Sequence, residues 1–99
     1  MADATHDGRR SQHVPPNEIV ERARRVLDDL GGMSPERVVS VEAADDGGWR
    51  VEFEVLEFRR IPETSDILAR YEVSMSKAGQ FRAYRQVGRR HRGDVEDLR

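Results

Sequence analysis

Apolar side chains recur along the chain with two different periods, and the change of period predicts the order of the elements. Six apolar residues from Ile19 to Leu30 fall at offsets 0, 1, 4, 7, 8 and 11, which is the stripe of an amphipathic helix. Asn17 is the expected N-cap, because its side-chain oxygen can accept a hydrogen bond from a free N–H group of the first turn. Gly31 and Gly32 are expected to end the helix.

Four later segments alternate between apolar and polar residues with the period of two that is typical of β-strands, namely 37–43, 49–55, 69–75 and 81–87. Asp46-Gly47-Gly48 predicts a tight turn, and Lys77-Ala78-Gly79 suits a three-residue loop with glycine in the left-handed region. The second loop predicts the pairs Met75–Phe81 and Val73–Ala83 on the apolar face, and Ser74–Arg82 and Glu72–Tyr84 on the polar face.

These elements predict an α+β fold with one N-terminal amphipathic helix packed on a four-stranded antiparallel meander sheet, in two layers. The helix stripe is expected to cover the apolar sheet face, and the other face is expected to contact water. The expected core residues of the sheet are Trp49, Val51, Phe53, Tyr71, Val73 and Phe81. Residues 1–14 are predicted to form a disordered arm, 15–92 a single α+β domain, and 93–99 a polar C-terminal tail.

The alternation changes phase at the end of the second strand. Val55 belongs to the apolar face, whereas Leu56 and Phe58 fall on the opposite face. A β-bulge or cover by segment 61–68 would bury these side chains. Alternatively, they form a partner surface together with Ile61 and Ile67, because contiguous exposed apolar area on a small protein usually binds something.

Composition limits the chemistry that is available. The chain has 99 residues, enough for one domain, and 36% of them are charged. It contains no cysteine, which excludes disulfides, thiolate metal sites and a cysteine nucleophile. No apolar run predicts a membrane span or a secretory signal, so we expect an intracellular protein. The three histidines do not have metal-ligand spacing, and no catalytic, cofactor-binding or metal site is expected.

Charge is unevenly distributed along the strands. Residues 42–57 carry six acidic residues and one basic residue, whereas 82–92 carry five arginines and no acid. Phe81 and Tyr84 are interleaved with these arginines, and this combination could bind RNA or single-stranded DNA by stacking and phosphate contacts. The favoured alternative is that these arginines pair with Glu52, Glu54 and Glu72 on adjacent strands, which would cancel the field that a polyanion needs. A third reading is that 89–92 contacts an acidic protein partner.

The segment Glu57-Phe58-Arg59-Arg60-Ile61-Pro62-Glu63-Thr64-Ser65-Asp66-Ile67-Leu68-Ala69-Arg70-Tyr71-Glu72-Val73 resembles the signature of the gas vesicle protein O (GvpO) family. Segments 37–42, 48–52 and 89–93 resemble the family as well. The resemblance implies a cytoplasmic accessory protein required for forming gas vesicles, the gas-filled protein shells that give cells buoyancy. It brings no catalytic residues, and it implies a role in assembly or regulation rather than in the bulk shell.

We therefore expect a non-enzymatic adaptor or scaffold for gas vesicle assembly, located in the cytoplasm or associated with the vesicle. The expected partners are other gas vesicle accessory proteins or the shell subunit, with no membrane, cofactor or small-molecule substrate. The alternative is a nucleic-acid-binding regulator of gas vesicle gene expression that acts through the arginine-rich fourth strand. The residues expected to contact the partner are Leu56, Phe58, Arg59, Arg60, Ile61, Ile67, Tyr84, Arg85, Arg89, Arg90 and Arg92. Arg59 and Arg60 could instead tie their connection down through Glu57 and Asp66.

Overall fold

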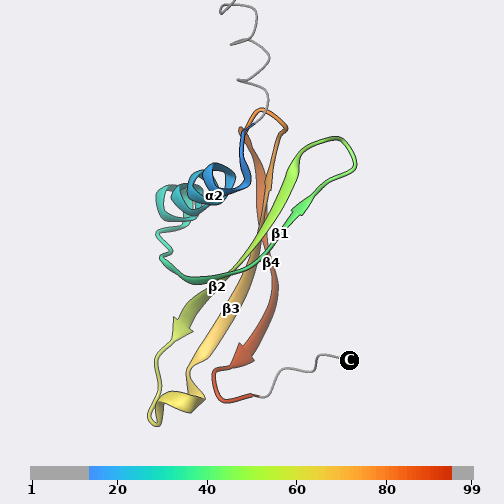
Figure 1. Ribbon diagram of the computed structural model, residues 1–99. Helices are drawn as coiled ribbons and strands as arrows, with labels where there is room; N and C mark the ends of the chain where they lie inside the picture. The colour runs from blue at the N-terminus through green and yellow to red at the C-terminus, as the bar shows by residue number, and fades with distance from the viewer. Residues whose placement is uncertain (1–13, 95–99) are drawn as a thin grey trace, which may run out of the picture.

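One helix precedes a four-stranded antiparallel sheet in the computed structural model, which describes residues 14–94. The elements are α2 (Pro16–Gly31), β1 (Pro35–Ala43), β2 (Trp49–Phe58), the 3-10 helix η1 (Glu63–Ser65), β3 (Ile67–Met75) and β4 (Phe81–His91). The strand order is β1-β2-β3-β4, a meander, and α2 lies across one face of the sheet (Figure 1). The predicted α+β class is confirmed. Most of the predicted arm and tail lies outside the described residues, so the domain boundaries stay predictions.

The helix begins at a different residue from the one that its sequence suggests. Pro15 occupies the N-cap position and Pro16 the first helical position, so the prediction of Asn17 as N-cap is wrong. Proline suits the first position because the fixed φ is already helical and the missing N–H would have no partner inside the helix. Gly32 ends the helix as expected, with φ at 63° and its N–H bonded to the carbonyl of Asp28 at 3.0 Å.

The core lies between α2 and the sheet. It is formed by Val14, Ile19, Ala23, Leu27, Val51, Phe53, Val73 and Met75. Val14 belongs to the predicted arm, yet its side chain is buried in this cluster. Leu30, the last residue of the predicted apolar stripe, is 59% exposed, so Leu27 is the last residue of the stripe that is buried. Phe81 is also largely exposed, at the first residue of the edge strand β4.

The register of the second hairpin differs from the prediction after its first pair. Met75 lies opposite Phe81 as expected, but Val73 pairs with Tyr84 instead of Ala83. Arg82 is an extra residue at this point, a β-bulge that shifts the pairs from Ser74–Ala83 to Tyr71–Gln86 by one position, and a second irregularity at Val87 shifts the pairs from Arg70–Gly88 onwards by one more. The shift moves Tyr84 to the apolar face, where it packs against the core.

A second bulge lies where the apolar alternation changes phase. Leu56 pairs with Leu68 and Phe58 pairs with Ile67, so Glu57 is the extra residue. The predicted bulge therefore exists. It does not bury Phe58, whose side chain remains 50% exposed.

The sheet extends well beyond the helix. β1 pairs with β2 only as far as Val55, whereas β2, β3 and β4 continue to Phe58, Ile67 and His91. A helix of 16 residues spans about 24 Å, and the molecule measures 61 × 32 × 19 Å. Figure 1 shows this free end opposite α2, and we call residues 56–68 and 88–94 the sheet tip.

Candidate docking surface

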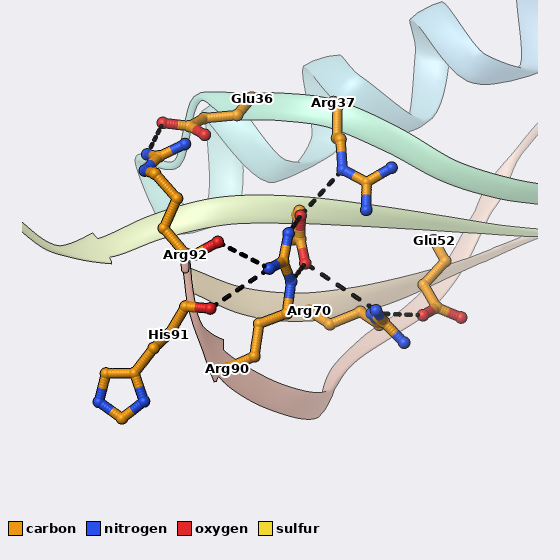
Figure 2. Close-up of polar contacts among 8 residues, drawn as sticks. Glu36, Arg37, Glu52, Arg70, Arg90, His91 and Arg92 are labelled. Carbon is orange, nitrogen blue, oxygen red and sulfur yellow. Dashed lines mark hydrogen bonds and ion pairs between the residues drawn. The ribbon is translucent and has the colours of Figure 1, made fainter. Parts of the chain in front are cut away.

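All four strands contribute to a cluster of ion pairs where the sheet leaves the helix. Glu54 of β2 is 2% exposed, on the face opposite α2. Arg90 of β4 donates to both carboxylate oxygens, at 2.6 and 3.1 Å, and Arg37 of β1 donates from Nε at 2.9 Å. Arg70 of β3 reaches Glu54 at 3.9 Å and Glu52 at 3.0 Å. Figure 2 shows the three arginines converging, and we call these five residues the Glu54 cluster.

The arginines keep Glu54 ionised. The hydrogen bonds from Arg90 lower the pKa of Glu54 most, and Arg37 lowers it further, whereas burial acts in the opposite direction. A buried carboxylate is expensive unless it is paired and hydrogen-bonded, and both of its oxygens have partners here. The cluster therefore links the two edge strands through one charge on a central strand.

A second buried carboxylate holds the connection between β2 and β3. Asp66 is 1% exposed and accepts a hydrogen bond from the backbone N–H of Arg60 at 2.7 Å. Arg92 donates to Asp66 at 3.1 Å and to Glu36 at 2.8 Å. The Arg60 N–H lowers the pKa of Asp66 most, followed by the Arg92 side chain. Glu36 and Asp66 raise the pKa of Arg92. These contacts join the connection to β4 and β1.

The arginines of β4 and its C-terminal extension are already paired. Each of the five has a carboxylate partner: Arg82 with Asp46, Arg85 with Glu72, Arg89 with Glu57, Arg90 with Glu54, and Arg92 with Glu36 and Asp66. Pairing with acids elsewhere in the fold was one of the sequence-based alternatives, although most of the partners differ from the expected ones. The pairing neutralises much of the positive field along this edge.

Arg59 and Arg60 differ from these arginines. Both are exposed, and neither guanidinium makes a hydrogen bond or an ion pair with any residue from 14 to 94. The expectation that Arg59 and Arg60 tie the connection down holds for Asp66, whose pKa is also lowered by the charge of Arg59, but not for Glu57, which pairs with Arg89. Only the backbone N–H of Arg60 binds Asp66. Beside them, Ile61 is fully exposed.

The sheet tip contains a groove of about 360 Å³, which we call the tip groove. Its apolar lining is provided by Phe58 and Ile67. Its polar lining is provided by Arg60, Arg89, Arg90, His91 and Asp94. The structure thus brings together five residues of the predicted partner set, namely Phe58, Arg60, Ile67, Arg89 and Arg90.

A second groove, of about 390 Å³, lies between the end of α2 and the sheet. It includes Leu56, Met33 and the rings of Tyr71 and Tyr84, which meet edge to face with centroids 6.2 Å apart. Leu56 and Tyr84 of the predicted set therefore lie in a different groove from the other five. The remaining four residues of the set line neither groove, namely Arg59, Ile61, Arg85 and Arg92.

Sequence reasoning missed the two buried carboxylates and part of both grooves. Glu54 alternates along β2 like Glu52, so no local signal separates the buried acid from the partly exposed one. Met33 and Tyr71 both line the second groove although they lie far apart in the sequence, so only the folded chain brings them together. Across residues 14–94, no group of three or more histidine, aspartate or glutamate side chains is arranged to hold a metal ion. Within the same range, no helix is long and apolar enough to cross a membrane.

The fold and the site define a small α+β protein, one helix on a four-stranded meander, whose sheet tip exposes apolar and arginine side chains together. Residues 2–96 match the family described as gas vesicle synthesis protein GvpO. The chain belongs to this family, as the segment from Glu57 to Val73 suggested.

The chain is similar to three gas vesicle proteins. Gas vesicle protein O of Streptomyces sp. (strain CB03234) is 39% identical over 88 residues, which are 89% of this chain and 68% of that protein. Gas vesicle protein O of Haloferax mediterranei is 34% identical over 76 residues, 77% of this chain and 54% of the relative. For gas vesicle protein O1 of Halobacterium salinarum, the identity is 36% over 76 residues, 77% and 63% of the two chains. The chain thus spans 54–68% of the length of these relatives. No solved structure matches it.

Proposed function

We propose that this chain is a non-enzymatic adaptor or scaffold that engages other gas vesicle proteins through the sheet tip during vesicle assembly in the cytoplasm. One observation carries the proposal: the sheet tip exposes Phe58 and Ile61 next to Arg59 and Arg60, whose guanidinium groups form no hydrogen bond or ion pair with the described residues. Aromatic and arginine side chains are enriched where proteins contact one another. The family supports a role in gas vesicle synthesis.

The ion pairs along β4 favour this role over regulation through nucleic acid. A nucleic-acid interface gains affinity by neutralising phosphates with free basic side chains. Arg82 and Arg85 are occupied by Asp46 and Glu72, and Arg89 by Glu57. Releasing these arginines to bind phosphates would leave three carboxylates near the polyanion.

The test is genetic complementation in a cell that forms gas vesicles and lacks its own copy of this gene. Wild type and Phe58→Ser are expressed at equal levels, and vesicles are counted and measured by electron microscopy and by pressure-sensitive light scattering. We expect wild type to restore the vesicles, and Phe58→Ser to give few or misshapen ones.

Phe81→Ser is the matched control, because Phe81 is similarly exposed but lies at the opposite end of β4. It is expected to behave as wild type. Vesicles of normal number and width in the Phe58→Ser cells would contradict the proposal.

A further inference from the structure

We infer that the tip groove binds an acidic peptide segment of a partner gas vesicle protein, in which an apolar side chain is flanked by carboxylates. The inference rests on the proposed adaptor function and adds the chemistry of the segment that docks. It follows from the shape of the groove, from the balance of charge in its lining and from the apolar residues beside it.

The groove suits one or two side chains of an extended segment. Its volume of about 360 Å³ is at the lower end of the usual range for ligand pockets. Phe58 and Ile67 form paired apolar positions on β2 and β3, and half of the Phe58 side chain remains exposed. An incoming leucine or phenylalanine side chain would cover this ring and remove apolar surface from water.

The polar lining holds one guanidinium without an ion pair among the described residues, that of Arg60, against one carboxylate, that of Asp94. Arg89 and Arg90 are compensated by Glu57 and Glu54, whereas the guanidinium of Arg60 has no ion pair with residues 14–94. Asp94 is the single carboxylate of the lining, and it already accepts a hydrogen bond from the backbone N–H of His91 at 3.1 Å.

Arg59, next to Arg60 in the chain, lies outside the groove lining and adds a second guanidinium without a hydrogen bond or ion pair to the described residues, although its charge also lowers the pKa of Asp66. Carboxylates are the complementary partners for guanidinium groups, because the planar fork matches the two oxygens. A carboxylate beside the apolar side chain of the segment would meet Arg60 in the lining.

The apolar component favours a protein segment over a nucleic acid. Ile61 is fully exposed next to the two free arginines, and it offers no flat ring on which a base could stack. Phe58 is the one aromatic ring in the lining of the tip groove, apart from the imidazole of His91. A side chain that enters from a peptide fits this arrangement, whereas a row of stacked bases would need several exposed rings.

The experiment uses overlapping synthetic peptides of about 15 residues that cover every other gas vesicle protein of the same organism, since this length spans about 50 Å when extended. The full-length chain, fluorescently labelled, is applied to the immobilised peptides, and hits are titrated by fluorescence anisotropy. We expect the bound peptides to be net acidic and to contain leucine, isoleucine or phenylalanine.

The variants assign the binding to the tip groove. Arg60→Glu and Phe58→Ser are each expected to weaken the hits about tenfold or more, which corresponds to about 1.4 kcal/mol. The controls are Arg25→Glu, an exposed arginine on α2 without a partner among the described residues, and Phe81→Ser, and both are expected to bind as wild type. Circular dichroism confirms that each variant is folded.

Several results would overturn the inference. These are the absence of bound peptides, bound peptides that are neutral or basic, or equal affinity of wild type and Arg60→Glu. Tighter and equally variant-sensitive binding of a single-stranded oligonucleotide would assign the groove to nucleic acid instead. If the peptides fail while Phe58→Ser still abolishes vesicles in cells, the adaptor function stands and only this inference falls. Normal vesicles in the Phe58→Ser cells would reject the adaptor function whatever the peptides do.

Discussion

Replacing Glu54 with glutamine removes the one negative charge that three arginines share. Glutamine keeps the size of the side chain and one acceptor oxygen, but it turns an NH2 group towards Arg90 or Arg37. Breaking a buried ion pair by removing one partner costs about 3–5 kcal/mol. Because Arg37 is half exposed and water screens part of the interaction, we expect the lower end, about 3 kcal/mol. For a domain of this size the melting temperature should then fall by at least about 12 °C.

The pH dependence identifies the lost charge. The hydrogen bonds from Arg90 lower the pKa of Glu54 below its ordinary value of 4.5. The unfolded chain therefore takes up this proton first as the pH falls. The contribution of Glu54 to stability is present above pH 4.5 and is lost as the pH falls from there through the lowered pKa. The difference in free energy of unfolding between wild type and Glu54→Gln should accordingly be constant near pH 7 and shrink below pH 4.5.

Urea unfolding followed by circular dichroism between pH 3 and 7 measures this difference. Glu52→Gln is the matched control, because Glu52 lies two residues away on the same face of β2 and pairs with Arg70 while partly exposed. The side chains of Glu52 and Arg70 are 22% and 31% exposed, so losing this pair should cost about 1 kcal/mol, clearly less than the loss in Glu54→Gln. Equal losses in the two variants, or a loss in Glu54→Gln that does not change with pH, would refute the buried charge as the cause.

Two further predictions concern the N-terminal boundary and nucleic acid. Val14→Ser should lower the free energy of unfolding by about 1–2 kcal/mol in urea titrations, because it exposes part of the core and buries a hydroxyl group. Unchanged stability would show that Val14 does not contribute to the core. Binding of the wild-type chain to single-stranded DNA should be weak and should change little with salt in anisotropy titrations, because the arginines of β4 are paired. A slope of log affinity against log salt near −0.7 for each of several phosphates would instead support the regulator.

The helix and the strands could be predicted from the sequence because their signals are local. The apolar stripe from Ile19 to Leu27 and the left-handed glycine at position 79, with φ at 82°, depend only on neighbouring residues. The bulge at Arg82 has no such signal. It moves the Tyr84 ring against Tyr71 and allows Arg82 to reach Asp46, and both gains come from residues that are distant in sequence.

The candidate site divides in the same way. Phe58 and Ile61 could be identified because an interruption of the alternation is visible along one strand. The difference in burial between Glu52 and Glu54 could not be predicted, since both occupy equivalent positions in the alternating strand pattern. Arg90 and Arg37 distinguish the two acids because they pair with Glu54. They belong to the two edge strands, so this pairing depends on the folded meander.

Polar contacts hold the sheet tip where no helix covers it. Asp66 binds the backbone N–H of Arg60 and the side chain of Arg92, and the N–H of Gly93 donates to the carbonyl of Thr64 at 2.8 Å. The connection between β2 and β3 thus keeps its shape without burying Phe58. A serine at position 58 should therefore cost little folding stability, because the ring that it replaces is already half in water. A loss of binding or of vesicles in that variant would then report on the surface of the protein and not on its folding.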